Sequence, residues 1–246
     1  VEIRIIPITD APIPNWNDSL PLSQGQIGEI ASKGPMVTRT YLNRPQKTAE
    51  AKIRQEEDVW HRMGDLGYFD AGGRLWFCGR KAHRVETEER RLYPVLCETI
   101  FNQHPRVART ALVGVGARGT QTPVLIIEPK PDAFPDTAAD RERFERELLA
   151  LGAEYDHSRS IQDIRFYPGT FPTDVRHNAK IQREKLAQWA ASGRPIRGTN
   201  VSYVGSSQRD RVWPRWGHLA GLLGALVVAA LSLVLLNRHA CRDERA

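Results

Sequence analysis

Cysteine is scarce in this chain: the 246 residues include three, Cys78, Cys97 and Cys241. None of them forms a Cys-x-x-Cys pair or stands at the spacing of a zinc site, which excludes a disulfide scaffold and a zinc module. The cysteine usage indicates a reduced, cytosolic environment for the main body of the protein. We predict no metal ion held by protein ligands, because no histidine pair has ligand-like spacing.

Two further absences exclude classes of function. No Gly-x-Ser-x-Gly elbow occurs, so a Ser-His-Asp hydrolase is not supported. The net charge of +6 comes mostly from scattered arginines rather than from a compact basic stripe with aromatic residues, and we therefore expect no nucleic-acid partner. The charge mildly favours anionic ligands and membrane surfaces. His83, His104 and His177 are interpreted as structural or surface residues.

The chain also has no initiator methionine and no charged-then-apolar leader, since Val1 stands inside an alternating run of apolar and charged residues. We therefore expect the sequence to be the C-terminal piece of a longer protein.

A long apolar run lies at the other end. Gly217–Leu236 contains only His218 and Ser232 as polar residues, and a helix of this length would span roughly 30 Å, about one bilayer core. The alternative, a buried core helix, would need apolar partners on all sides. We predict a transmembrane helix at 217–236, preceded by a linker at 192–216 and followed by a short polar tail at 237–246. Arginines flank both ends almost equally, so the charge pattern orients the span only weakly.

Between these ends the hydrophobic pattern mixes strand and helix periods, which predicts an α+β fold. Helical spacing is clear where Phe144, Leu148 and Leu151 recur on one face. Strands are predicted at 1–8, 28–32, 74–79, 108–114 and 124–129, and helices at 94–103, 141–151 and 181–191.

The most informative motif is Trp60–Gly67, which contains the pair Gly64 and Asp65 and is followed by the hairpin signal Asp70–Gly73. A carboxylate that follows a glycine in a turn can accept both hydroxyls of a ribose. The alternative is that Asp65 only caps the turn.

This motif and its neighbours resemble the acyl-adenylate-forming superfamily, which contains acyl-CoA ligases, luciferases and nonribosomal-peptide adenylation domains. The resemblance covers roughly residues 1–190 and includes five segments in the expected order: 25–30, 33–35, 41–45, 48–49 and 60–67. It implies an AMP-forming, acid-activating enzyme that uses ATP and Mg²⁺, with Asp65 binding the ribose.

The resemblance also implies a domain organisation. Residues 1–79 would end the large adenylating domain, 80–83 would form a hinge, and 84–191 would form a small, mobile α+β lid. Arg80, in Gly79–Lys81, would contact ribose or phosphate, for which a guanidinium is suited; the alternative is a solvated surface charge. The family's usual Asp or Lys pivot is replaced by Ala82.

Lys180, in the segment Asn178–Ile181, is similar to the family's catalytic lysine, although Ala179 replaces the usual glycine. We place Lys180 at the start of a helix, where the helix dipole disfavours a cation, so a functional reason for it is expected. Such a cation can bridge the substrate carboxylate and the α-phosphate and stabilise the charge that grows during transfer.

One segment departs from the ligases. The ligase pattern of a basic residue, a glycine and an arginine falls here on Glu88, Glu89 and Arg91, and a carboxylate at position 89 would crowd and repel coenzyme A. The segments 81–87, 92–94, 97–98 and 101–105 instead resemble the olefin β-lactone synthetases of bacterial hydrocarbon biosynthesis.

That resemblance implies a fatty β-hydroxy acid as substrate, activated as acyl-AMP and closed by its own hydroxyl to a β-lactone. A long-chain fatty acid-CoA ligase is the alternative enzyme, and a non-catalytic membrane-tethered module that binds nucleotide or partner proteins is the alternative of another class. The family's phosphate loop and acyl pocket are missing here, so we expect this piece alone to be inactive. The expected location is the bacterial inner membrane with the catalytic part in the cytoplasm, and other enzymes of the hydrocarbon pathway are candidate partners.

Overall fold

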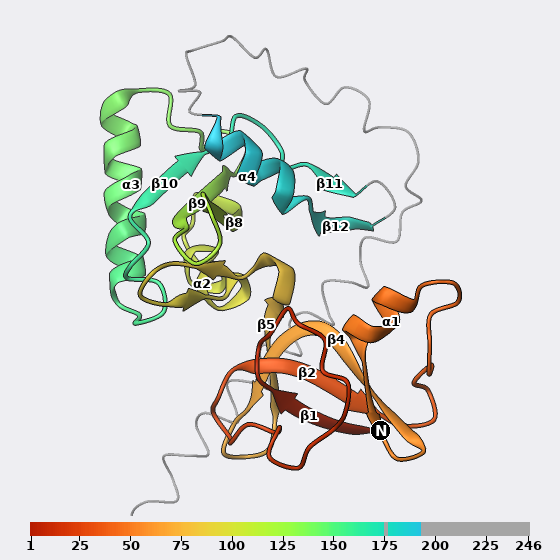
Figure 1. The fold of residues 1–246 in the computed structure, drawn as a ribbon. Coiled ribbons are helices and arrows are strands. Elements are labelled where there is room, and N and C mark those ends of the chain that lie inside the picture. The colour runs from red at the N-terminus through yellow and green to blue at the C-terminus, as the bar shows by residue number, and fades with distance from the viewer. Residues whose placement is uncertain (175–176, 193–246) are drawn as a thin grey trace, which may run out of the picture. The chain divides into compact units, whose positions relative to one another are not determined.

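The computed structural model describes residues 1–174 and 177–192, and these lie within one compact unit. Its two larger sheets have separate cores and are joined by the short 3₁₀ helix η1 (Lys81–His83). Figure 1 shows the two sheets and the helices that accompany them. The α+β class predicted from the hydrophobic pattern is confirmed.

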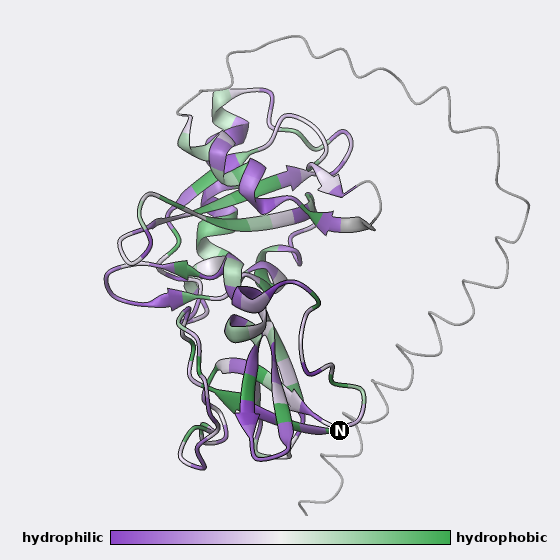
Figure 2. Cartoon of the chain, turned by 45° about the vertical axis from the view of Figure 1, so that its right-hand side comes forward, coloured by the Kyte–Doolittle hydropathy of each residue, from purple (hydrophilic) through white to green (hydrophobic). Residues whose placement is uncertain are grey.

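The first sheet is antiparallel and has five strands: β1 (Glu2–Ile6), β2 (Gly28–Lys33), β3 (Lys52–Gln55), β4 (Asp58–Phe69) and β5 (Leu75–Arg80). Four of them lie in the order β1-β2-β4-β3. The fifth strand, β5, pairs with another part of the long strand β4. The helix α1 (Pro45–Ala51) precedes β3. Figure 2 shows polar and apolar residues side by side in these strands, and the first four residues of β2 are all buried.

The core of this sheet is built around Trp60. Its ring stacks on Trp16 with the ring centres 4.1 Å apart, and Ile6 and Ile53 are fully buried beside it. Burying an aromatic side chain of this size stabilises the fold by about 2 kcal/mol or more.

Asp65 lies in the middle of β4 and not in a turn, which corrects the sequence interpretation. The register between β2 and β4 shifts between Glu29 and Ala31, which pair with Leu66 and Arg62 respectively. The intervening residues of β4 form a bulge, and Gly64 there has φ 68°, a conformation that glycine adopts without strain. The Gly64–Asp65 motif, which the sequence suggests is a turn, is therefore a β-bulge. Glycine is common in both structures because both can require a positive φ.

The second sheet has three strands in the order β10-β9-β8. Its central strand β9 (Thr122–Pro129) is antiparallel to β8 (Val107–Val115) and parallel to β10 (Asp163–Phe166). Before this sheet come the hairpin of β6 (Val85–Glu86) with β7 (Arg91–Leu92) and the helix α2 (Pro94–Phe101). The helix α3 (Ala138–Ala153) lies between β9 and β10 in the chain. After β10 come the hairpin of β11 (Thr173–Asp174) with β12 (His177–Ile181) and the helix α4 (Arg183–Ala191).

Helices cover both faces of the second sheet. On β9, Leu125 and Ile127 join the core with α2 and α3, whereas Val124 and Ile126 join the core with α4. Consecutive residues therefore point to opposite cores, which explains the unbroken apolar run of this strand. The predicted face of α3 is confirmed, since Phe144 and Leu148 are fully buried.

The predicted helix at 181–191 begins two residues later, at Arg183. Lys180 belongs to the strand β12, so the expectation that it stands at a helix start is wrong. Within residues 1–174 and 177–192, no helix is long and apolar enough to cross a membrane. The predicted linker, membrane span and tail, together with Cys241, lie outside the described residues.

A buried ion cluster ties the first sheet to η1. Glu29 on β2 accepts hydrogen bonds from Arg62 of β4 at 2.6 Å and from Lys81 of η1 at 3.0 Å. The side chains of Glu29 and Arg62 are each 1% exposed. Arg62 and Lys81 also donate to the backbone oxygen of Thr9, so every charge in the cluster has a hydrogen-bond partner.

The intact protein with Glu29→Gln should lose about 3–5 kcal/mol of unfolding free energy, because two buried or half-buried cations would lose their anion. Urea denaturation measures this change. The control is Glu2→Gln, which removes a surface ion pair with Arg4 and should change stability by less than about 1 kcal/mol. Equal effects of the two substitutions would show that the buried cluster does not hold the fold.

Candidate functional site

A cavity of about 410 Å³ brings together residues that are far apart in the sequence. Arg80 from the end of β5 and Lys180 from β12 both line it, so the structure joins two of the three predicted site residues. Gly64, Ala82 and His83 contribute from the first sheet and η1. The rest of the wall comes from the C-terminal hairpin and α4: Asp174, Ile181, Gln182 and Glu184.

Asp65, the third predicted residue, is not in the cavity wall, but its neighbours Gly64 and Arg80 are. Asp65 and Arg80 are cross-strand partners, and Nη1 of Arg80 lies 3.0 Å from Oδ1 of Asp65. Oδ1 is buried, and its contact with Arg80 is an ion pair. Burial raises the pKa of Asp65, and the Arg80 charge partly opposes this.

A buried carboxylate beside an arginine keeps lone pairs that can accept from a hydroxyl donor such as a ribose. The arginine and the lysine on the cavity wall fit phosphate groups. The described residues are therefore suited to a nucleoside phosphate. Among residues 1–174 and 177–192, no cluster of histidine, cysteine and acidic residues is suited to hold a metal ion.

Lys180 is exposed, and its charge lies close enough to His83 and Glu184 to influence both. The position of its strand is fixed by the turn that leads into α4. The backbone N–H of Gln182 donates to Pro172 at 2.8 Å, and the Gln182 side-chain amide donates to Thr173 at 3.0 Å. These bonds close the hairpin that carries Lys180.

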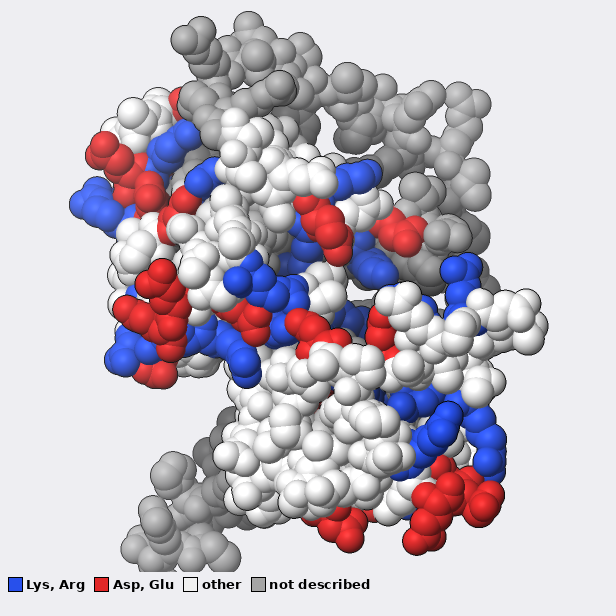
Figure 3. All heavy atoms as spheres, viewed as in Figure 1, with Lys and Arg blue, Asp and Glu red and all other residues white. Residues whose placement is uncertain are grey.

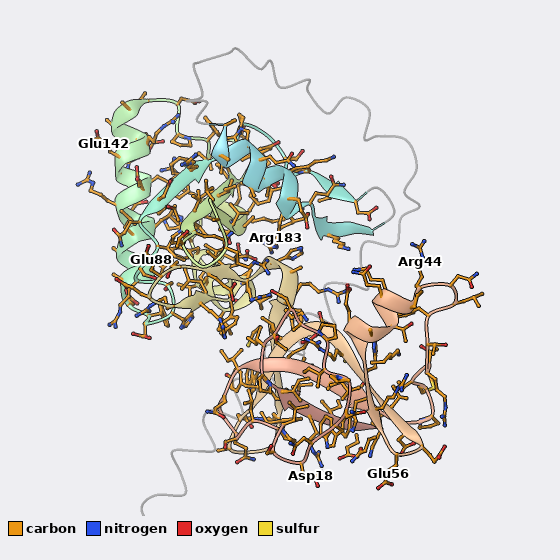
Figure 4. The ribbon with its side chains drawn as sticks, viewed as in Figure 1. Asp18, Arg44, Glu56, Glu88, Glu142 and Arg183 are labelled. Carbon is orange, nitrogen blue, oxygen red and sulfur yellow. The ribbon has the colours of Figure 1, made fainter. Side chains whose placement is uncertain are left out.

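The start of α4 is anchored by a buried ion pair. Arg183 forms a two-pronged contact with Glu98 of α2, with distances of 2.5 Å and 2.8 Å, and Glu98 also accepts from the backbone of Leu112 at 2.7 Å. Burial raises the pKa of Glu98, and Arg183 opposes the shift. Figure 4 labels Arg183 on the side of α4 that faces α2 and β8. The ion pair between Arg183 and Glu98 therefore fixes the backbone position of the next residue, Glu184.

The segment after η1 is held by a second set of ion pairs. Arg84 contacts Asp10 at 2.6 Å and Glu86 at 2.9 Å, and Arg118 also reaches Asp10, at 3.2 Å. The hydrogen bond from Arg84 lowers the pKa of Asp10. Basic and acidic side chains are interspersed over this part of the surface in Figure 3. The side chain of Ala82 forms no ion pair, but its backbone oxygen accepts a hydrogen bond from Arg118 at 3.1 Å.

Sequence reasoning missed Glu29, Glu98 and Glu184 as contributors. Each has an arginine or histidine partner at least 33 positions away, so no local spacing reveals the pair. His83 was assigned a structural or surface role, but it lines the cavity. His104 packs on Phe144 with the ring centres 4.9 Å apart, which agrees with a structural role, and the side chain of His177 lies outside the described part.

Comparisons with known proteins confirm the resemblance to acyl-adenylate-forming enzymes. The structure of ATP-bound MatB from Rhodopseudomonas palustris matches with a TM-score of 0.58 and 21% identity, covering 77% of this chain and 34% of that chain. The 2-succinylbenzoate–CoA ligase of Geobacillus kaustophilus is 35% identical over 145 residues, 58% of this chain and 29% of that enzyme. No family model matches the sequence.

Two relatives define the resemblance further. The chain is 52% identical over 198 residues to the olefin β-lactone synthetase of Xanthomonas campestris pv. campestris, covering 78% of this chain and 35% of that protein. It is 49% identical over 196 residues to the olefin β-lactone synthetase of Stenotrophomonas maltophilia, with 78% and 34% covered. The chain is thus a homologue of these synthetases and spans about a third of their length.

Asp65→Asn in the intact protein should weaken ATP binding about 10- to 100-fold, the effect of losing one charge-assisted hydrogen bond. It should also stabilise the protein at neutral pH. The folded pKa of Asp65 is raised, so its contribution to stability is present below the unfolded pKa of 3.8 and is lost as the pH rises through the folded pKa.

Calorimetric ATP titration and urea denaturation at pH 3 and pH 7 measure the two effects. The control is Asp58→Asn at the exposed start of the same strand. Unchanged ATP affinity in the Asp65 variant would remove Asp65 from the nucleotide site.

Proposed function

We propose that the intact protein activates a long-chain β-hydroxy fatty acid with ATP and closes the acyl-adenylate to a β-lactone. The observation that carries this proposal is the approximately 50% identity to two olefin β-lactone synthetases along a segment whose fold brings Arg80 and Lys180 to one cavity. The acid would attack the α-phosphate of Mg-ATP and expel pyrophosphate. The β-hydroxyl oxygen would then attack the activated carbonyl and release AMP.

Each site residue has a defined task in this reaction. Lys180 would bridge the carboxylate and the α-phosphate, which repel each other until a cation stands between them. Asp65 and Arg80 would hold the ribose, with Arg80 also available to a phosphate. Ring closure is unimolecular, so correct orientation of the two reacting groups supplies much of the rate.

The alternative is a long-chain acyl-CoA ligase, because CoA ligases are also among the relatives. The turn between β6 and β7 favours the lactone. Thr87 accepts hydrogen bonds from the backbone of Glu89 and Arg90 at 3.3 Å and 3.0 Å, and this tight turn leaves Glu88 and Glu89 exposed. Figure 4 labels Glu88 on this turn. Two carboxylates there repel the phosphates of coenzyme A.

The remaining parts of the proposal concern location and partners. The apolar run at 217–236 would anchor the protein in the bacterial inner membrane, with the catalytic part in the cytoplasm where ATP is available. The anchor would keep the enzyme beside its poorly soluble substrate and product. Other enzymes of the hydrocarbon pathway would be its neighbours there.

Lys180→Ala in the intact protein should slow pyrophosphate release about 100- to 1000-fold, because the growing charge on the α-phosphate would lose its cation. A coupled phosphate assay with a β-hydroxy fatty acid measures the rate. Lys185→Ala is the matched control, since Lys185 is an exposed lysine on α4 that is outside the cavity wall. An unchanged rate in the Lys180 variant would favour a non-catalytic binding module.

The product of the intact protein should be a β-lactone and AMP without coenzyme A, and added coenzyme A should leave the product unchanged. Mass spectrometry of the extracted products tests this. Formation of a CoA thioester from a plain fatty acid would instead identify a ligase.

A further inference from the structure

Lactone closure requires more than an activated carbonyl, because the attacking hydroxyl must lose its proton. An alcohol is a weak nucleophile at neutral pH unless a positioned base accepts that proton. Lys180 and Arg80 are cations and cannot serve, and Asp65 is outside the cavity wall. The remaining proton acceptors of the cavity wall are the carboxylates of Asp174 and Glu184 and the imidazole of His83, and an imidazole has the highest ordinary pKa of these groups and is the strongest base.

His83 is the described imidazole in this cavity, and it is fixed by a carboxylate. It closes η1, its side chain is 17% exposed, and its Nε2 lies 3.3 Å from Oε1 of Glu184. Glu184 stands in the first turn of α4, and the hydrogen bond from its own backbone N–H is the largest cause that lowers its pKa. The carboxylate is thus ionised near neutral pH and can only accept hydrogen bonds.

This pairing determines the tautomer of His83. Because Glu184 can only accept, Nε2 of His83 carries the proton and donates it, which leaves Nδ1 as the unprotonated nitrogen of the neutral ring. No hydrogen bond from Nδ1 to another described residue is present. A carboxylate that orients an imidazole in this way recurs in enzymes that use histidine as a base.

Burial and two neighbouring cations favour the neutral form of the ring. Burial is the largest cause that lowers the pKa of His83, and the Arg183 and Lys180 cations lower it further, whereas Glu184 opposes them. The charged groups that share the two cavities lined by His83 come from six segments of the fold: Arg80 (β5), Arg84 (after η1), Arg118 (the β8–β9 loop), Asp174 (β11), Lys180 (β12), and Arg183 and Glu184 (α4).

We propose that His83, oriented by Glu184, is the catalytic base that accepts the β-hydroxyl proton during lactone closure. The β-oxygen forms a bond to the acyl carbon, and the bond between that carbon and the phosphate oxygen of AMP breaks. The proton moves from the β-hydroxyl to Nδ1 of His83 and then to solvent, while AMP leaves with the bonding electron pair. This inference rests on the proposed function.

The geometry of the cavity is compatible with this role. His83 and Lys180 line the same cavity, and Lys180 would hold the carboxyl group that becomes the acyl-adenylate. The hydroxyl of a β-hydroxy acid is separated from the acyl carbon by only two carbon atoms, so it must lie within roughly 3–3.5 Å of that carbon before it attacks. A base for this hydroxyl must therefore share the cavity with the lysine.

The test uses the intact protein with a β-hydroxy fatty acid and ATP, and follows pyrophosphate release and lactone formation in the same single-turnover reaction. In His83→Gln, the rate of lactone formation relative to that of pyrophosphate release should fall about 100-fold, within the usual range for loss of a general base. Acyl-adenylate should accumulate. The wild-type closure rate should fall as acid protonates His83, with an inflection below the ordinary histidine pKa because burial lowers the pKa of His83, and the variant should lack this inflection.

Glu184→Gln should lower the same ratio about tenfold and shift the inflection to lower pH, because a neutral amide no longer stabilises the imidazolium. The matched control is Glu142→Gln on the outer side of α3, labelled in Figure 4, which should change nothing. A His83→Gln ratio within threefold of wild type overturns the inference. If that variant loses pyrophosphate release as well, Glu184→Gln decides, and an unchanged ratio there overturns the inference.

The same assay separates this inference from the proposed function. Wild-type protein that releases pyrophosphate without forming lactone would overturn the proposed function. Wild-type lactone formation together with an unaltered His83 variant would overturn the role of His83 alone.

Discussion

The buried carboxylate of Glu29 fixes how the first sheet meets the segment that follows it. It accepts hydrogen bonds from Arg62 of β4 and Lys81 of η1, so the strand that carries Asp65 and the segment that carries His83 are joined through a single anion. A buried ion pair adds little net stability compared with apolar packing, but losing one partner is strongly destabilising. The cluster therefore fixes a geometry more than it raises stability, and that geometry places Arg80 and His83 at the same cavity.

A second buried carboxylate does the same for the other half of the cavity. Glu98 binds Arg183 at the start of α4. Lys180 and Glu184 come shortly before and directly after Arg183 in the chain, so this ion pair helps to fix their positions. The cavity wall thus combines two cations with an imidazole that pairs with a carboxylate. This arrangement suits a reaction in which negative charge develops on a phosphate while a hydroxyl gives up its proton.

The sequence allowed much of this to be predicted. Strands β2, β8 and β9 and the buried face of α3 followed from hydrophobic period, because each buries one or both faces along its length. Arg80 and Lys180 followed from resemblance to known motifs. By contrast, the short elements β3, β10 and α1, which carry mixed patterns, were not predicted. The long strand β4 was not predicted either, because its Gly64–Asp65 bulge reads as a turn and a bulge and a turn both use glycine.

From the amino-acid sequence alone came the α+β class, several of the strands and helices, the buried face of α3, and the side chains suited to a nucleotide. These features depend on local period and residue chemistry. Only the tertiary structure decided that Arg80, His83, Lys180 and Glu184 meet, because their contacts join segments separated by up to about a hundred residues. No local pattern records such distant pairs: the paths of β4, η1 and β12, fixed by buried carboxylates, bring them together.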